Sequence, residues 1–468
     1  QKIKKMGLKV CVLQPDYSTT AVDNQYYDPI RQLAHLLPDA TVKTVLLNKL
    51  TTYKQLQALK HEQYDIFVNL CEGYLEWEVP SVDVIHCLDL LNLPYTGPTA
   101  TLYDPPKELM KYVAYCEGIQ SPAYHLISSA AAAADLAETA NFPLFIKPAK
   151  AGDSLGIDHG SLVNNHSELM AKVNDIIAAY PELLLEEYIA GREFTVLVVA
   201  NPDGRSCKSF KPVEYVFPEG FAFKTYALKT AELHPGANIP CNDPALEKEL
   251  RHAAEKIFNC FGGKGYARMD FRVKDDNSIY FLEVNFTCSV FYTDGYEGSA
   301  DFILQYDGIG QAGFLQQIIE EGMARHARKQ KAYALRGNSI AGFGIYALRP
   351  IKKNECLYQG EERATRVVTK KHVEAHWNEE EQMRFRQYAY PLGGDAYAFW
   401  DAEPGEWAPQ NHSCDANTRM AGLNMIATRV IATGEELTLD YALFLDKEME
   451  PFQCQCGSAQ CRGIIKGI

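Results

Sequence analysis

The sequence predicts a multidomain fold in which α/β regions are followed by a mainly β region with a metal-bound tail. Short apolar runs of the buried parallel-strand type alternate with helical patterns up to about residue 324. From Tyr333 the chain changes to short strands with many turns. Four cysteines near the C-terminus have the spacing of metal ligands and predict the tail: Cys414, Cys454, Cys456 and Cys461.

Length and composition are those of an ordinary soluble globular protein. The chain has 468 residues, 47% hydrophobic and 23% charged, which leaves room for two or three domains. It holds no run of about 18 apolar residues, and its start lacks the apolar run of a signal peptide. We therefore expect no membrane partner and a cytoplasmic location, with a nuclear one left open. The thirteen cysteines, an odd number, fit reduced thiols better than disulfides.

The charge distribution bears on possible partners. A net charge of −14 argues against a protein that binds polyanions with its whole surface. Residues 323–331 are locally basic, but they lie at an expected helix end and linker, where such charge is most often solvated. Nucleic acid is therefore not expected as a partner.

Residues 1–103 are predicted to form an N-terminal α/β lobe. The runs Lys9–Leu13 and Asp65–Asn69 have the character of buried parallel strands, and the helical patterns between them indicate a βαβ start. The turn cluster Pro94–Pro98 ends this lobe.

Residues 104–324 are predicted to form a second, mixed α/β region. The expected elements are helices over Lys107–Glu117 and Pro244–Phe261, and strands near Phe142–Lys147, Leu183–Tyr188, Phe194–Ala200 and Ile279–Val284. A basic linker over 325–334, a mainly β domain over 335–450 and a cysteine-bearing segment over 451–468 complete the predicted organisation.

A hairpin in the second region is predicted to bring oxygen ligands together. Its strands are Arg268–Val273 and Ile279–Asn285, joined by a short turn. Side chains two apart share a strand face, so Glu283 and Asn285 point the same way, and the hairpin can bring Asp270 beside them. Two carboxylates and an amide suit Mg²⁺ that bridges nucleotide phosphates. The alternative is an exposed hairpin whose acidic side chains bind no metal.

A second set of residues favours the phosphate interpretation. Lys147 ends a strand, and a loop with Gly152, Ser154 and Gly156 follows, in which backbone N–H groups can cradle phosphates. The segment Leu183–Val196 comes at a distance that allows a hinge over an adenine. With these segments the chain resembles the ATP-grasp superfamily, and within it the D-alanine–D-alanine ligase type, over about residues 65–320.

This resemblance implies ATP and Mg²⁺ as cofactors, and ATP-dependent carboxylate–amine ligation through an acyl phosphate. The implied cofactor-binding positions are the phosphate lysines Lys107 and Lys147, the adenine-hinge residues Glu186, Tyr188 and Ile189, the ribose contact Glu193, and the further positions Ser154, Glu187 and Lys224. The implied magnesium ligands are Asp270, Glu283 and Asn285. Arg268 matches the catalytic arginine that steadies the acyl-phosphate transition state.

The sequence departs from the ligase pattern where the amino-acid substrates would bind. Leu13–Tyr17 replaces a tight glycine turn, and Asp153 precedes Ser154 in place of a serine pair. Asp294 stands where a serine normally receives the carboxylate of the second substrate, and its negative charge repels a carboxylate. Synthesis of a D-alanine dipeptide is therefore not expected, although ligase chemistry is.

The last region contains short motifs in a fixed order. Gly342-Phe343-Gly344 lies between short strands, Asn411-His412-Ser413-Cys414 follows, and Asp440-Tyr441 precedes the three-cysteine tail. In this order the motifs resemble the SET-domain methyltransferases with a post-SET zinc segment, over about residues 335–463. Taken alone, His412 could be a core histidine and Tyr441 a packed aromatic residue.

The second resemblance implies S-adenosylmethionine and Zn²⁺ as cofactors, with the four cysteines as zinc ligands. The implied S-adenosylmethionine contacts are Gly342, Phe343, Gly344, Asn411 and His412. Tyr441 would be the catalytic tyrosine, lining a channel in which positioning an amine against the methyl group supplies most of the rate. Leu439 replaces an aromatic residue that often limits the number of methyl groups, so multiple methylation is possible.

Together the two sites predict a bifunctional enzyme that ligates a carboxylate to an amine and methylates a lysine or another amine. The expected substrates are small amino acids or peptides, with a protein lysine as another acceptor, and the resemblance leaves a homodimer open. One alternative is a protein-lysine N-methyltransferase whose ATP-grasp region is a nucleotide-binding or recruitment module. Another is an interaction protein in which both sites are vestigial.

Overall fold

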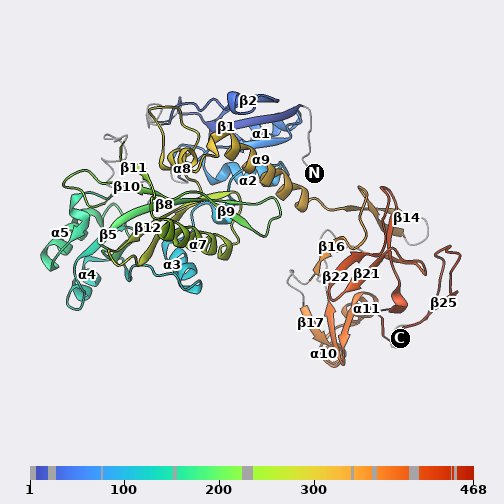
Figure 1. Ribbon diagram of the computed structural model, residues 1–468. Helices are drawn as coiled ribbons and strands as arrows, with labels where there is room; N and C mark the ends of the chain where they lie inside the picture. Colours follow the sequence, from blue (N-terminus) through green and yellow to red (C-terminus); the bar gives the residue numbers. More distant parts are fainter. Residues whose placement is uncertain are drawn as a thin grey trace. The chain divides into compact units, whose positions relative to one another are not determined.

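The computed structural model describes the chain except for residues 1–6, 19, 21–27, 75–76, 151–154, 224–235, 339–341, 361–365, 400–409, 444, 447–450 and 468. The chain forms two compact units, Gln1–Ala327 and Arg328–Ile468, and each has its own core (Figure 1). Among the described residues, no helix combines the length and the apolar character needed to cross a membrane.

The N-terminal lobe is built on a parallel sheet. Strands β1 (Leu8–Pro15), β2 (Ala40–Leu47) and β3 (Ile66–Asn69) pair in the order β2-β1-β3. β1 and β3 confirm the two predicted strands. The prediction missed β2, because Thr41, Lys43 and Thr44 interrupt its apolar run and the strand lies at the sheet edge.

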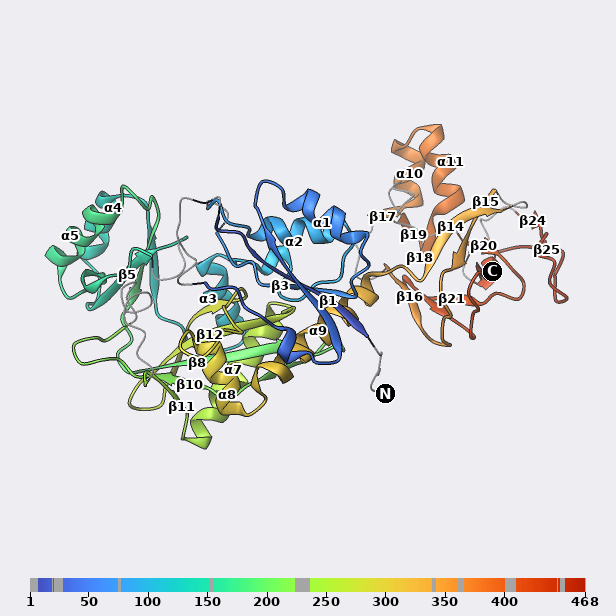
Figure 2. The ribbon, with the colours of Figure 1, turned by 90° about the horizontal axis from the view of Figure 1, so that it is seen from above.

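Alternating residues of β1 belong to two different cores, because successive side chains of a strand point to opposite faces. Cys11 and Leu13 belong to the core that includes α1 (Thr52–Lys60) and α2 (Val82–Leu90). Val10 and Val12 belong to the core that includes α8 (Ser299–Asp307) and α9 (Gly310–Lys329). Figure 2 shows α1 and α2 together beside this sheet. The short helices η1 (Ala34–Leu36) and η2 (Ala100–Leu102) complete the lobe.

The second region contains two sheets. The smaller sheet is antiparallel, in the order β4-β7-β5-β6, and packs against two helices. Its elements are β4 (Tyr124–Ile127), α4 (Ala130–Ala137), β5 (Leu144–Pro148), η3 (His159–Ser161), β6 (Leu162–Val163), α5 (His166–Ile176) and β7 (Leu183–Glu187).

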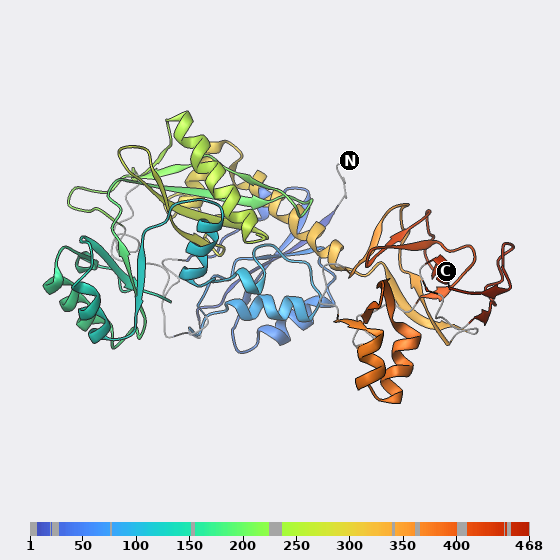
Figure 3. The same cartoon turned by 90° about the horizontal axis from the view of Figure 1, so that it is seen from below.

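The larger sheet carries the predicted hairpin and has the order β11-β10-β8-β12-β13, with β9 paired to β8. Its strands are β8 (Arg192–Ala200), β9 (Cys207–Ser209), β10 (Val213–Tyr215), β11 (Asn238–Pro240), β12 (Tyr266–Val273) and β13 (Ile279–Asn285). Helices α3 (Lys107–Cys116) and α7 (Pro244–Cys260) share its core and lie on one side of it in Figure 3. The predicted helices and strands of this region are thus present.

Local sequence explains where helix α7 begins. Asp243 caps α7, because its carboxylate accepts from the N–H groups of Ala245 and Leu246, and Pro244 occupies the first turn, where no N–H is needed.

The prediction of a linker over 325–334 is corrected by the extent of α9. This helix continues to Lys329, and the next strand begins at Tyr333. Arg325 is buried and lies 3.4 Å from Glu321 one turn earlier, so this part of the basic segment is packed helix.

The second unit is mainly β, as predicted. Its sheets have the orders β14-β15-β23-β20, β16-β22-β21, β17-β19-β18 and β24-β25. The strands are β14 (Tyr333–Asn338), β15 (Gly342–Ala347), β16 (Cys356–Gln359), β17 (Arg366–Thr369), β18 (Tyr390–Gly393), β19 (Ala396–Phe399), β20 (Asn411–His412), β21 (Thr418–Ala421), β22 (Asn424–Ala427), β23 (Glu436–Leu439), β24 (Phe452–Gln453) and β25 (Ile464–Ile465). The helices are α10 (Lys370–His376), α11 (Glu379–Tyr388) and η5 (Tyr441–Leu443).

Candidate functional site

The β12–β13 hairpin gathers polar side chains on one face of the larger sheet. Asp270 lies directly opposite Glu283, and Arg268 lies directly opposite Asn285. Residues that face each other in an antiparallel pair, and residues two apart in one strand, share a face. A guanidinium nitrogen of Arg268 lies 3.4 Å from an oxygen of Asp270, and the Asn285 amide donates to Glu283 at 3.4 Å. The predicted convergence of Asp270, Glu283 and Asn285 is confirmed.

This donor set fits a magnesium ion, because its oxygens come from two carboxylates and one amide. Asp270 is buried, and Glu283 is half-buried at the same face. Burial lowers the pKa of Arg268, but Asp270, Cys288 and Glu283 together outweigh burial and raise it, so the guanidinium stays positive beside the carboxylates. The face therefore offers both ligands for a cation and a fixed positive charge.

Lysines from α3 and β5 surround this face. The Nζ of Lys107 lies 3.9 Å from Oε2 of Glu283, and the Nζ of Lys147 lies 2.6 Å from Oε2 of Glu186. Burial lowers the pKa of Lys147, but Glu186 and Glu283 outweigh burial and raise it. Lys111, which the sequence analysis missed, contacts the other oxygen of Glu186. Its signal was its place one helical turn after Lys107.

The predicted adenine hinge lies at the end of β7. The main-chain N–H groups of Glu187 and Tyr188 donate to neighbouring carbonyls, and Ile189 is buried. The side chain of Glu186 turns instead toward the two lysines. The predicted contacts Ser154 and Lys224 lie outside the described residues.

The predicted ribose contact, Glu193, is held by an arginine that the sequence analysis missed. Arg272 lies directly opposite Glu193 across β12 and β8, with a nitrogen–oxygen distance of 3.0 Å. Arg272 is 4% exposed and also donates to the carbonyls of Gly191 and Ala222. Its spacing from Arg268 and Asp270 in one strand was the signal that could have placed it beside them.

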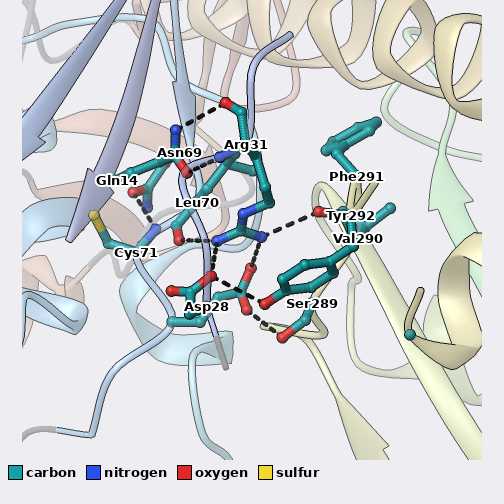
Figure 4. A network of polar contacts seen from close by, with 12 residues as sticks. Gln14, Asp28, Arg31, Asn69, Leu70, Cys71, Ser289, Val290, Phe291 and Tyr292 are labelled. Carbon is teal, nitrogen blue, oxygen red and sulfur yellow. Dashed lines mark hydrogen bonds and ion pairs between the residues drawn. The ribbon is translucent and has the colours of Figure 1, made fainter. Parts of the chain in front are cut away.

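A buried arginine network joins segments of the first unit that lie far apart in the sequence (Figure 4). Arg31 is 1% exposed, and its guanidinium lies 3.2 Å from the carboxylates of both Asp28 and Glu72. Ser289 donates to Glu72 at 2.5 Å, and the hydroxyl of Tyr292 donates to Asp28 at 3.0 Å. The sequence gives no signal for this network, because Ser289 and Glu72 are 217 positions apart.

The network lies in the region where the sequence departs from the ligase pattern. Asp294, which stands at the position of the substrate-binding serine in the ligase pattern, is exposed to solvent. Tyr292, two residues earlier, packs on the guanidinium of Arg31 at 4.9 Å from its ring centre, and Arg31 donates to the carbonyl of Val290 at 3.1 Å. The hydroxyl groups of Ser289 and Tyr292 thus donate hydrogen bonds to carboxylates of the protein itself, Glu72 and Asp28.

In the second unit, the glycine motif and Asn411 approach each other across β23. The sheet order places β15, which begins with Gly342, and β20, which begins with Asn411, on the two sides of β23. The Asn411 amide donates to Glu436 at 2.7 Å and to the carbonyl of Phe343 at 3.0 Å. A Cβ on Gly344 would lie 2.2 Å from the same Glu436 oxygen, so a larger residue there would force the Glu436 side chain to shift. Glu436 is a further residue that the sequence analysis missed.

His412 connects the predicted catalytic tyrosine with the cysteines. The main-chain N–H of Tyr441 donates to Nδ1 of His412 at 3.1 Å, so the neutral ring carries its hydrogen on Nε2, which lies 3.4 Å from Sγ of Cys414. Burial lowers the pKa of His412, which favours this neutral form. The hydroxyl of Tyr441 donates to the carbonyl of Gln410. Both ring nitrogens of His412 therefore face protein groups.

The four predicted cysteine ligands come together. The Sγ atoms of Cys414, Cys454, Cys456 and Cys461 all lie within 4.8 Å of one another. A tetrahedral zinc ion with Zn–S bonds of about 2.3 Å needs sulfur atoms about 3.8 Å apart, so the donor set fits zinc. The N–H of Arg462 donates to Sγ of Cys414 at 3.3 Å, and the Arg462 guanidinium pairs with Asp440, the neighbour of Tyr441.

Comparisons with known proteins match both units. The family profile for the D-ala D-ala ligase C-terminus matches residues 113–292, and the SET domain profile matches residues 342–442. The D-alanine–D-alanine ligase of Legionella pneumophila (strain Corby) is 30% identical over 262 residues, which cover 52% of this chain and 68% of the relative. The D-alanine–D-alanine ligase of Chlorobaculum tepidum is 34% identical over 210 residues, 42% of this chain and 56% of the relative.

Solved structures show the same fold in the larger part of the chain. The D-Ala:D-Ser ligase VanG of Enterococcus faecalis superposes with a TM-score of 0.51 at 17% identity, covering 68% of this chain and 99% of that one. The D-alanine–D-alanine ligase of Coxiella burnetii superposes with a TM-score of 0.50 at 18% identity, covering 69% and 97%. These likenesses confirm the predicted ATP-grasp fold. The chain belongs to the D-alanine–D-alanine ligase family and carries a SET domain in its C-terminal unit.

Proposed function

We propose that the chain is a bifunctional enzyme. The first unit joins a carboxylate to an amine with ATP, through an acyl phosphate, and the second unit methylates a lysine or another amine with S-adenosylmethionine. The ligase substrates are small amino acids or peptides. The methyl acceptor is an amine of the same pathway or a protein lysine, because two sites on one chain favour linked reactions.

The observation that supports the ligase half is the pairing of Asp270 with Glu283 across the hairpin, with Lys107 at 3.9 Å from Glu283. Phosphoryl transfer depends mainly on positioning and on neutralising charge. Asp270, Glu283 and Asn285 would hold Mg²⁺, which supplies Lewis-acid polarisation of the phosphate oxygens. Lys107 and the Arg268 guanidinium would offset negative charge that develops on the transferred group.

The methyl-transfer half depends on positioning. Asn411 is fixed by Glu436 and the carbonyl of Phe343, and Tyr441 is fixed through its N–H and its hydroxyl. A neutral amine placed in line with a methyl donor needs little further acid or base, once it has lost its proton. The four cysteines would hold Zn²⁺ and so tie the C-terminal tail to the segment that carries Asn411 and His412.

The proposal is tested by incubating the full chain with ATP, Mg²⁺, S-adenosylmethionine and mixtures of amino acids and peptides. We expect amine-dependent formation of ADP, formation of S-adenosylhomocysteine, and a ligated or methylated product in the mass spectrum. Absence of ADP with every mixture, while the chain still binds nucleotide, would reject the ligase half. The alternative of a protein-lysine methyltransferase with a nucleotide-binding module would then stand.

A further inference from the structure

One carboxylate in the first unit is shared by two buried lysines. Glu186, on β7, contacts Lys111 of α3 through one oxygen, and its other oxygen lies 2.6 Å from Nζ of Lys147 on β5. Glu186 and Lys111 are each 3% exposed, and Lys147 is 8% exposed. Because a buried charge is costly unless it is paired, the ionisation of each of these groups depends on the others.

The fold places Glu186 between Lys147, the proposed phosphate-binding lysine, and Lys111, which has no part in the proposed function so far. Phe145 of β5 lies opposite Glu186, so Lys147, two residues later, is the diagonal neighbour of Glu186 on the same face. On the other side, Lys111 follows Lys107 by one helical turn, and the two share a face of α3. Lys107 in turn lies 3.9 Å from Glu283.

The charges of this cluster are unequal. Two ammonium groups meet one carboxylate at ion-pair distance. The charges of Lys147 and Lys111 outweigh burial and lower the pKa of Glu186, so the carboxylate stays ionised. With both lysines protonated, the cluster therefore carries a net positive charge that a phosphate can neutralise.

We propose that Lys111 is a positioning residue of the nucleotide site, an inference that rests on the proposed ATP-binding function. Lys111 holds one oxygen of Glu186, and this fixes the other oxygen and the Lys147 ammonium that it contacts. Without Lys111, Lys147 is the cation that remains beside the Glu186 carboxylate in this cluster. Lys147 would then pair with Glu186 and would no longer be available as the counter-ion of a phosphate.

The test is a titration of the full chain with a non-hydrolysable ATP analogue and Mg²⁺, followed by calorimetry. We expect Lys111→Met to raise the Kd about tenfold, a usual size for coupling within one ion-pair network. Because Lys111 acts through Glu186, adding K111M to E186Q should change the Kd of E186Q by less than about twofold. Should K111M not fold, K111Q takes its place, because its amide still donates to Glu186 without a charge.

Lys172 supplies a matched control. It is buried and ion-paired with Asp158 at 2.9 Å in the same unit, but it is not part of the cluster. K172M should lower the thermal unfolding temperature and leave the Kd within about twofold of wild type. The inference is wrong if K111M binds the analogue like wild type, if its effect adds to that of E186Q, or if K172M weakens binding equally. If the wild-type chain does not bind the analogue, the proposed ATP function is wrong and the inference falls with it.

Discussion

The carboxylates of Asp270 and Glu283 face each other directly across β12 and β13. Two carboxylates on one buried face repel each other unless cations neutralise them. Each has a cation from a different element of the fold, because Arg268 lies 3.4 Å from Asp270 and Lys107 lies 3.9 Å from Glu283. Each carboxylate thus has a cationic partner within the protein and still presents the oxygens that a metal needs.

Replacing Asp270 by asparagine is expected to lower ADP formation at least about 100-fold, because it removes one of two carboxylates for Mg²⁺ and the partner of Arg268. Formation of S-adenosylhomocysteine by the other unit should not change. The exposed Asp276, in the turn of the same hairpin, gives the control variant D276N, which should keep wild-type ADP formation. Wild-type ADP formation by D270N would contradict the proposed metal face.

Replacing Cys456 by serine is expected to release the metal and to lower methyl transfer at least about 100-fold, because it removes one of four thiolates of the proposed zinc site. Metal content and S-adenosylhomocysteine formation are the measurements, and ADP formation should be unchanged. Cys356, an exposed cysteine outside the cluster, gives the control C356S. Loss of ADP formation as well would show that the two units do not fold independently.

Replacing Gly344 by alanine is expected to weaken binding of S-adenosylmethionine at least about tenfold. The added Cβ would lie 2.2 Å from the Glu436 oxygen and 2.9 Å from the Asn411 nitrogen, so the contact that fixes Asn411 must shift. Gly337, on the adjacent strand β14, has no atom of the described residues within 4 Å of an added Cβ, and G337A should bind like wild type. Equal binding by G344A and G337A would show that the Glu436 contact does not shape the site.

Local spacing predicted the parts of the site that lie on one element or one hairpin. The hairpin was predictable because its turn and its period of two lie within 18 residues, Arg268 to Asn285, and the structure places Asp270 and Glu283 opposite each other. Three of the four clustered cysteines are also close in the sequence. The fourth, Cys414, lies 40 residues before Cys454 in the sequence, and the folded chain brings its thiol to the other three.

The residues that the sequence analysis missed act through partners from other elements. Lys111 and Arg272 look like ordinary charged residues in a helix and a strand, and only the fold shows that Glu186 and Glu193 face them. Arg31 is the extreme case, because its partners come from three separate segments. Charge type can be read from a sequence, whereas the partner of a buried charge depends on tertiary packing.

The free energy of unfolding is expected to depend on pH through Glu72. Burial raises the pKa of Glu72 from 4.5 to about 7, although Arg31 opposes this shift. Below about pH 4.5 the carboxyl is neutral in the folded and the unfolded chain. As pH rises toward 7 the unfolded chain releases this proton first, so Glu72 lowers the free energy of unfolding by about 1.4 kcal/mol per pKa unit, about 3 kcal/mol in all.

Denaturant unfolding of wild type and Glu72→Gln at a series of pH values isolates this effect, because the variant cannot titrate at this position. The stability of E72Q relative to wild type should rise between about pH 4.5 and 7 and then level off. Glu62 is exposed, and its hydrogen bond from Tyr64 lowers its pKa, so any change for E62Q should have the opposite sign. A constant difference between wild type and E72Q across this range would mean that Glu72 is ionised throughout, held by Arg31.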